Sequence, residues 1–138
     1  MSKYSCYFLA SVAIVLLLAG CAGTSEIKAR LGQEFSLSVG QTALIAGENL
    51  KIRFEEVAGD SRCPRNVTCV WEGKVDCTVV ITENALSHQI SLVQPGLTDQ
   101  YSIATYQDYQ LTFRVEPYPE EGKQIPAHDY RLLLTISK

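Results

Sequence analysis

The sequence predicts an all-β domain, namely an antiparallel β-sandwich of the immunoglobulin-like or Greek-key kind with about seven strands. Apolar and polar residues alternate over many short segments after residue 32, which is the mark of strands with one buried face. Turn-forming residues separate these segments at intervals of roughly 8–12 residues. No segment has the apolar spacing of an amphipathic helix. A small β-barrel is the alternative arrangement.

The first half of the domain contains three segments with this alternation. Phe35–Val39 alternates and ends at a glycine, and Leu44–Ala46 predicts a short strand before the turn Gly47–Asn49. Leu50–Val57 places large apolar residues on one face and charged residues on the other. We therefore expect three strands before the first cysteine of the domain.

The second half continues the pattern less evenly. Its five predicted segments are Val75–Ile81, His88–Val93, Tyr101–Tyr106, Tyr109–Val115 and Tyr130–Ile136. The polar and aromatic segment Tyr101–Tyr106 predicts either an edge strand or a loop, and Gln94–Gly96 predicts a turn. Glu116–His128 contains three prolines and a glycine, so we expect a long loop there.

Residues 1–20 predict a signal peptide rather than part of the fold. Lys3 precedes the apolar run Phe8–Ala19, which is too short to cross a bilayer of about 30 Å as a helix. The run ends in Leu-Ala-Gly-Cys at residues 18–21, which resembles the lipobox of bacterial lipoproteins. That resemblance implies that Cys21 is acylated and becomes the N-terminus of the mature protein.

The expected organisation of the mature chain follows from this signal peptide and lipidation site. Residues 21–32 are small, polar and charged, which predicts a lipidated tether, and residues 33–138 form a single β-domain. The lipid would hold the domain on the extracytoplasmic face of the cell membrane or the outer membrane, with the membrane as its first partner. The net charge of −3 and the lack of a Lys/Arg cluster argue against nucleic acid as a partner.

Three cysteines remain for the domain, and disulfides form in such a compartment. Cys63 and Cys69 lie six residues apart around a proline-containing turn, so they are the preferred bridge. Cys77 shares the apolar face of its strand, which predicts a buried free thiol. Pairing of Cys77 with Cys63, with Cys69 or with a second molecule remains open. The C-x5-C-x7-C spacing lacks the C-x2-C knuckle of zinc sites, so no metal is expected.

Polar and aromatic residues near these cysteines offer further candidates. Asp60 and Arg62 predict a turn cap and an ion pair that stiffens the loop, with a ligand-binding pair as the alternative. Trp71 predicts a core residue beside the disulfide, with an exposed anchor for a partner as the alternative.

Three tyrosines outside the expected core faces give the candidate binding surface. They are Tyr101, Tyr106 and Tyr118, and we expect them near the loop Pro117–Pro126. Aromatic side chains on a long loop are typical of binding surfaces.

The segment Asp60–Gly73 has the pattern D-S-R-C-P-x-x-V-x-C-x-W-x-G. It resembles a signature of an uncharacterised group of small bacterial lipoproteins and secreted proteins. The resemblance implies an extracytoplasmic β-domain with a Cys63–Cys69 bridge and no assigned activity. The Gly40–Gln41 turn and the all-β layout are also loosely similar to chagasin-type protease inhibitors.

These observations predict a lipid-anchored extracytoplasmic β-domain with a binding or structural role in the cell envelope. Its partner would be an envelope protein or another extracytoplasmic ligand. No catalytic motif is present, so we expect no enzyme activity, no catalytic residue and no cofactor. The alternatives are a protease-inhibitor-like binding module and a small thiol-dependent enzyme that uses Cys77.

Overall fold

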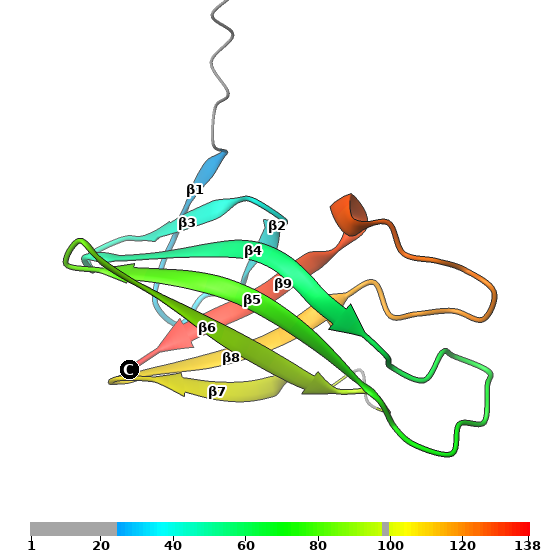
Figure 1. Cartoon of the computed structure of the whole chain (residues 1–138). Coiled ribbons are helices and arrows are strands. Elements are labelled where there is room, and N and C mark those ends of the chain that lie inside the picture. The colour runs from blue at the N-terminus through cyan, green and yellow to red at the C-terminus, as the bar shows by residue number, and fades with distance from the viewer. Residues whose placement is uncertain (1–24, 98–99) are drawn as a thin grey trace, which may run out of the picture.

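The computed structural model describes residues 25–97 and 100–138, which form a two-layer β-sandwich (Figure 1). One sheet has five strands in the order β1-β3-β4-β5-β6, and the other has four in the order β2-β9-β8-β7. The strands are β1 Glu26–Ala29, β2 Phe35–Ser38, β3 Thr42–Ile45, β4 Leu50–Asp60, β5 Lys74–Glu83, β6 Leu86–Pro95, β7 Ser102–Tyr106, β8 Tyr109–Glu116 and β9 Arg131–Ser137. The predicted sandwich is therefore confirmed, and over these residues the sheets do not close into a barrel.

The strands form where hydrophobic alternation predicted them. In β4 the side chains of Leu50, Ile52 and Phe54 are buried, whereas Lys51 and Arg53 between them are exposed. The same alternation holds in β5, β8 and β9, and the buried faces of both sheets meet in one core. All strand pairs are antiparallel except β1 with β3, which are parallel. The long pair β4–β5 carries two register shifts near its end, at Phe54–Glu56 and Val57–Gly59.

Two of the differences from the sequence prediction lie in the edge strands of the five-stranded sheet. The tether expected over residues 21–32 contains β1, because backbone pairing with β3 stabilises Glu26–Ala29 although only Ala29 is buried. The turn expected at Gln94–Gly96 begins later, because β6 runs through Pro95. Since β6 is an edge strand, the missing N–H of a proline costs no pairing there.

The signal peptide predicted over residues 1–20 and the lipidation site Cys21 lie outside the described residues. Within the described ranges, no helix has the length and apolar character needed to cross a membrane. The only helical element they contain is a single 3-10 turn, Ala127–Asp129.

Two loops meet at one end of the sandwich, which we call the loop end. Segment 61–73 joins β4 to β5, and segment 117–130 joins β8 to β9 (right side of Figure 1). The amide of Arg65 donates to the carbonyl of Pro119 at 3.0 Å, so the two segments are in contact. The β5–β6 hairpin, with its turn at Asn84–Ala85, marks the opposite end.

Candidate functional site

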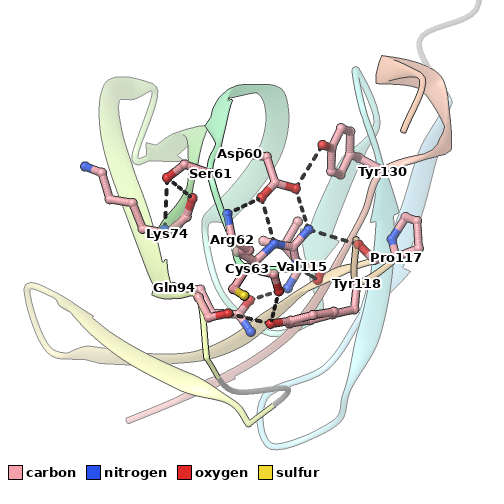
Figure 2. A network of polar contacts seen from close by, with 11 residues as sticks. Asp60, Ser61, Arg62, Cys63, Lys74, Gln94, Val115, Pro117, Tyr118 and Tyr130 are labelled. Carbon is pink, nitrogen blue, oxygen red and sulfur yellow. Dashed lines mark hydrogen bonds and ion pairs between the residues drawn. The ribbon is translucent and has the colours of Figure 1, made fainter. Parts of the chain in front are cut away.

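The loop end is built around Arg62, whose side chain is completely buried. Its Nη1 donates to the carbonyl of Val115, and its Nη2 donates to the carbonyl of Pro117, both at 2.9 Å (Figure 2). These two carbonyls belong to the end of β8 and the residue that follows it. Arg62 therefore ties the loop of the five-stranded sheet to the four-stranded sheet.

Asp60 binds the guanidinium on its Nε and Nη2 side. Its Oδ1 accepts hydrogen bonds from the Arg62 amide at 3.2 Å and Nε at 2.9 Å. Its Oδ2 accepts from Arg62 Nη2 at 2.6 Å and from the Tyr130 hydroxyl at 3.0 Å. The predicted turn cap and ion pair are confirmed, and the pair is bidentate, which is the strongest geometry for it. Because each guanidinium nitrogen has a hydrogen-bond partner, the buried charge is tolerated.

Opposing effects act on the ionisation of Asp60. Burial alone would raise the pKa of its carboxyl, but the hydrogen bonds and charge of Arg62 outweigh burial and hold the pKa below its ordinary value of 3.8. The folded state therefore prefers the ionised carboxylate. Burial, and then the hydrogen bond to Asp60, raise the pKa of Tyr130 to about 12, so its hydroxyl stays a donor.

A lowered pKa makes Asp60 a source of acid sensitivity. Its contribution to stability is present above the pKa of the unfolded state and is lost as pH falls through the lower pKa of the folded state. We expect the free energy of unfolding to fall between roughly pH 5 and pH 2, and to fall less steeply in Asp60→Asn. Urea unfolding of both proteins across this range measures the two slopes. Equal slopes would show that Asp60 is not the group that titrates.

Tyr118 fills the inner side of the loop end. Its hydroxyl hydrogen bonds to the carbonyls of Cys63, at 2.8 Å, and Gly96. The guanidinium carbons of Arg62 and Arg65 lie 5.2 and 5.3 Å from the centre of its ring, within the range of cation–π attraction. We use the name Arg62 network for Asp60, Arg62, Tyr118, Tyr130 and the carbonyls that they bind.

The predicted Cys63–Cys69 disulfide is present, with an S–S distance of 2.08 Å and a Cα–Cα distance of 5.9 Å. It closes a small loop whose base is joined to β5 by the hydrogen bond from the Cys63 amide to the Glu72 carbonyl, at 3.3 Å. Such a closure restricts the unfolded chain more than the folded one.

Removing this bridge is expected to lower the free energy of unfolding by about 2 kcal/mol, the loop-entropy value for so short a closure. The double variant Cys63→Ala/Cys69→Ala, compared with the wild type in urea, measures the difference. The single variant Cys77→Ala is a separate comparison for loss of a core thiol. Unchanged stability of the double variant would mean that the bridge does not constrain the chain.

Two glycines allow the backbone segments of the loop end to touch. A Cβ atom at Gly73 would lie 1.7 Å from the Ser61 carbonyl oxygen, and Gly73 has φ +67°. A Cβ atom at Gly96 would lie 2.0 Å from the Glu72 carbonyl oxygen. Any side chain at either position would push the loop away from the sheet.

Trp71 is not a core residue, so the prediction that it packs beside the disulfide is wrong. Its exposed fraction is 75%, and that of its neighbour Val70 is 93%. Arg62 and Tyr118 occupy the inner side of the loop, which leaves the tryptophan on the outside. The alternative, an exposed anchor, is what the geometry allows.

A groove of about 580 Å³ opens beside the Arg62 network. It lies between the end of β4 and the loop that follows Pro117, and its apolar lining includes Val57, Pro64, Pro119 and Ile125. An ion pair joins the groove residues Glu120 and Lys123. Apolar walls with a few fixed polar groups are typical of binding grooves.

The three tyrosines of the predicted binding surface occupy different places. Tyr118 belongs to the Arg62 network and is half-buried. Tyr101 hydrogen bonds to Glu34 and stacks under Arg114. Tyr106 pairs with Tyr109 at the other end of β7, so the three side chains do not form one surface.

Cys77 is the free cysteine of the described chain, as predicted, and it is completely buried in β5. Burial raises the pKa of its thiol to about 12, and its Sγ donates weakly to the Leu92 carbonyl at 3.5 Å. A buried, protonated thiol lacks the properties of a nucleophile. Among the residues that the structure describes, no three His, Cys, Asp or Glu side chains lie close enough to hold a metal ion.

Sequence reasoning missed one inter-sheet link at this end. Gln94 is completely buried, its Oε1 accepts from the Val115 amide at 2.7 Å, and its Nε2 donates to the Gln100 carbonyl at 3.3 Å. Its position on the same face of β6 as Ile90 and Leu92 is the only local signal, and its partner Val115 is 21 residues away.

Comparison of the chain with protein-family models, curated proteins and solved structures finds no match. The geometry of the loop end is therefore the basis for a functional assignment.

Proposed function

We propose that the protein is a lipid-anchored, extracytoplasmic binding module whose working surface is the groove at the loop end. The observation that carries the proposal is the buried Arg62 network, which holds two long loops in one arrangement. Neither the pairing of the sheets nor the hydrophobic core requires such a costly buried charge at the end of a sandwich. Fixed loops on a rigid scaffold are the usual form of a binding surface.

The groups in the groove suit binding rather than chemistry. Asp60 and Tyr130 already satisfy each other and Arg62, so neither is poised as a base or a nucleophile. The apolar walls and the Glu120–Lys123 pair offer a mixed surface of the kind that an extended peptide segment fits. Because the loops are ordered before the ligand arrives, less conformational entropy is lost on binding.

Photo-crosslinking in intact cells tests this proposal. A benzophenone amino acid replaces Gln124, an exposed residue of the groove, and in a second variant it replaces Gln89, an exposed residue of β6 away from the groove. We expect one crosslinked envelope protein from position 124 and none from position 89. Equal crosslinking from both positions, or none from position 124, would contradict the assignment.

A protease-inhibitor-like module is the second candidate, because two loops held at one end of a sandwich meet its main requirement. A rigid, exposed loop can enter a protease active site without being ordered first. Inhibition assays against a panel of serine and cysteine proteases separate this candidate from the first. Stoichiometric inhibition that Trp71→Ala removes would support it.

A further inference from the structure

Three exposed apolar residues lie in segment 61–73 of the loop end. They are Val67, inside the ring that the disulfide closes, and Val70 and Trp71, directly after it, with exposed fractions of 36%, 93% and 75%, and we call these residues the loop tip. No residue from 66 to 71 is charged. At the opposite end, in contrast, the turn before β4 carries Glu48, and β5 ends at Glu83.

We infer that the loop tip inserts into the interfacial layer of the lipid bilayer to which the domain is anchored, and so orients the groove relative to the membrane. The inference rests on the part of the proposed function that places a lipid on Cys21. Tryptophan is enriched at the boundary between lipid headgroups and acyl chains, and apolar side chains beside it add to the area that is buried there.

The direction of β1 is the first argument. β1 runs parallel to β3 and therefore antiparallel to β4, whose end leads into the disulfide loop. Ser25, which precedes Glu26, consequently lies on the loop-end side of β1. A tether that continues in this direction leads toward the loop tip rather than toward the β5–β6 hairpin.

The length of the tether is the second argument. Glu26 lies level with Val80, through the pairs Glu26–Thr42, Thr42–Arg53 and Arg53–Val80. The base of the disulfide loop at Lys74 lies six residues before Val80 in β5, or about 20 Å away at ~3.3 Å per residue. The five steps from Cys21 to Glu26 span at most about 17 Å.

The acylated residue therefore reaches no further than the base of the loop, and the loop tip extends beyond that base. A domain whose loop end faces the membrane meets the bilayer with Val67, Val70 and Trp71. To face the membrane with the opposite end, the chain would have to reverse its direction within these five steps. The disulfide and the Arg62 network keep the tip ordered, so insertion has little further entropic cost.

The fluorescence of Trp71, the only tryptophan in the sequence, tests the inference directly. The full mature lipoprotein is purified and incorporated into phosphatidylcholine vesicles with or without brominated acyl chains. We expect a blue shift of the emission, loss of most of the emission in brominated vesicles, and protection from the aqueous quencher acrylamide. Emission that acrylamide quenches freely and bromine does not would overturn the inference.

A matched variant moves the probe to the other end of the molecule. Trp71→Phe/Leu86→Trp places the only tryptophan on the β5–β6 hairpin, where Leu86 has a comparable exposed fraction of 68%. We expect no quenching by bromine in this variant. Equal quenching at both positions would also overturn the inference.

Two further readouts separate this inference from its premise and from a protein partner. The mass of the N-terminal peptide reports whether Cys21 is acylated. If Cys21 is acylated but bromine does not quench Trp71, the lipid anchor stands and the inference of insertion is wrong. If Cys21 is not acylated, both the lipid anchor and the inference of insertion are wrong. A blue shift that needs envelope protein and occurs without bromine quenching would assign the loop tip to a protein partner and overturn the inference.

Discussion

Replacing Arg62 by methionine is expected to lower the free energy of unfolding by about 3–5 kcal/mol, because one member of a buried ion pair is removed. The variant leaves the half-buried carboxylate of Asp60 without its main partner. It also leaves the carbonyls of Val115 and Pro117 without their donors at the end of β8. Methionine matches much of the volume of arginine, so the loss would reflect polar contacts rather than a cavity.

Urea unfolding of Arg62→Met and Arg53→Met measures this effect against a matched control. Arg53 pairs with Glu55 at 3.1 Å, but both side chains are about 40% exposed, at 44% and 40%. An exposed pair contributes about 1 kcal/mol or less. Similar losses for the two variants would mean that burial of Arg62 does not give its ion pair special weight.

Replacing Gly73 by alanine is the second large effect, with an expected loss of about 3 kcal/mol or more from steric overlap and backbone strain together. The new Cβ atom would lie 1.7 Å from the Ser61 carbonyl oxygen, which is backbone and cannot rotate away. The loop must then separate from β5, which disturbs the hydrogen bond from the Ser61 amide to the Lys74 carbonyl at 2.8 Å.

Alanine substitutions at two other glycines separate the contribution of backbone strain from that of steric overlap. Gly47 has φ +85° with no heavy atom within 4 Å of a new Cβ, so Gly47→Ala measures backbone strain alone, about 1–2 kcal/mol. Gly59 has open space and no positive φ, so Gly59→Ala is expected to be nearly neutral. Thermal or urea unfolding of the three variants gives the order. A loss for Gly73→Ala no larger than that for Gly47→Ala would contradict the close approach.

Hydrophobic alternation predicted most of the fold because the buried face of each strand is a property of the strand's own sequence. Leu50–Val57 and Tyr109–Val115 are clear cases, and their apolar positions are buried in the structure, except Val57, which is half-buried. Hydrophobic alternation did not predict β1, because this strand depends on pairing with β3 rather than on a buried face of its own. An edge strand that buries a single alanine gives no periodic signal.

The candidate site was predictable only where its contacts are local. Asp60 and Arg62 are two residues apart, and their ion pair follows from the turn between them. The partners Val115, Pro117 and Tyr130 are 53 to 70 residues away, so the sequence does not indicate that the pair joins the two sheets. The sequence therefore predicted the ion pair that stiffens the loop, but not the contacts of Arg62 with the other sheet.

The two aromatic residues of the loop end exchanged the positions expected for them. Trp71 was predicted in the core and is exposed, whereas Tyr118 was placed on a binding surface and is half-buried against Cys63. The Tyr118 hydroxyl lies within hydrogen-bond distance of two backbone carbonyls, and its ring faces the guanidinium groups of Arg62 and Arg65. The backbone carbonyls and guanidinium groups at the inner side of the loop, rather than hydrophobicity, decide which ring is buried.

Amide hydrogen exchange tests most directly the central claim that the Arg62 network holds the loop end in one arrangement before any ligand binds. The amides of Ser61, Cys63 and Arg65 donate to the carbonyls of Lys74, Glu72 and Pro119. We expect them to exchange nearly as slowly as the amides shared by β4 and β5, and to lose that protection in Arg62→Met. Exchange of these three amides in the wild type at the rate of an unstructured chain would contradict the claim.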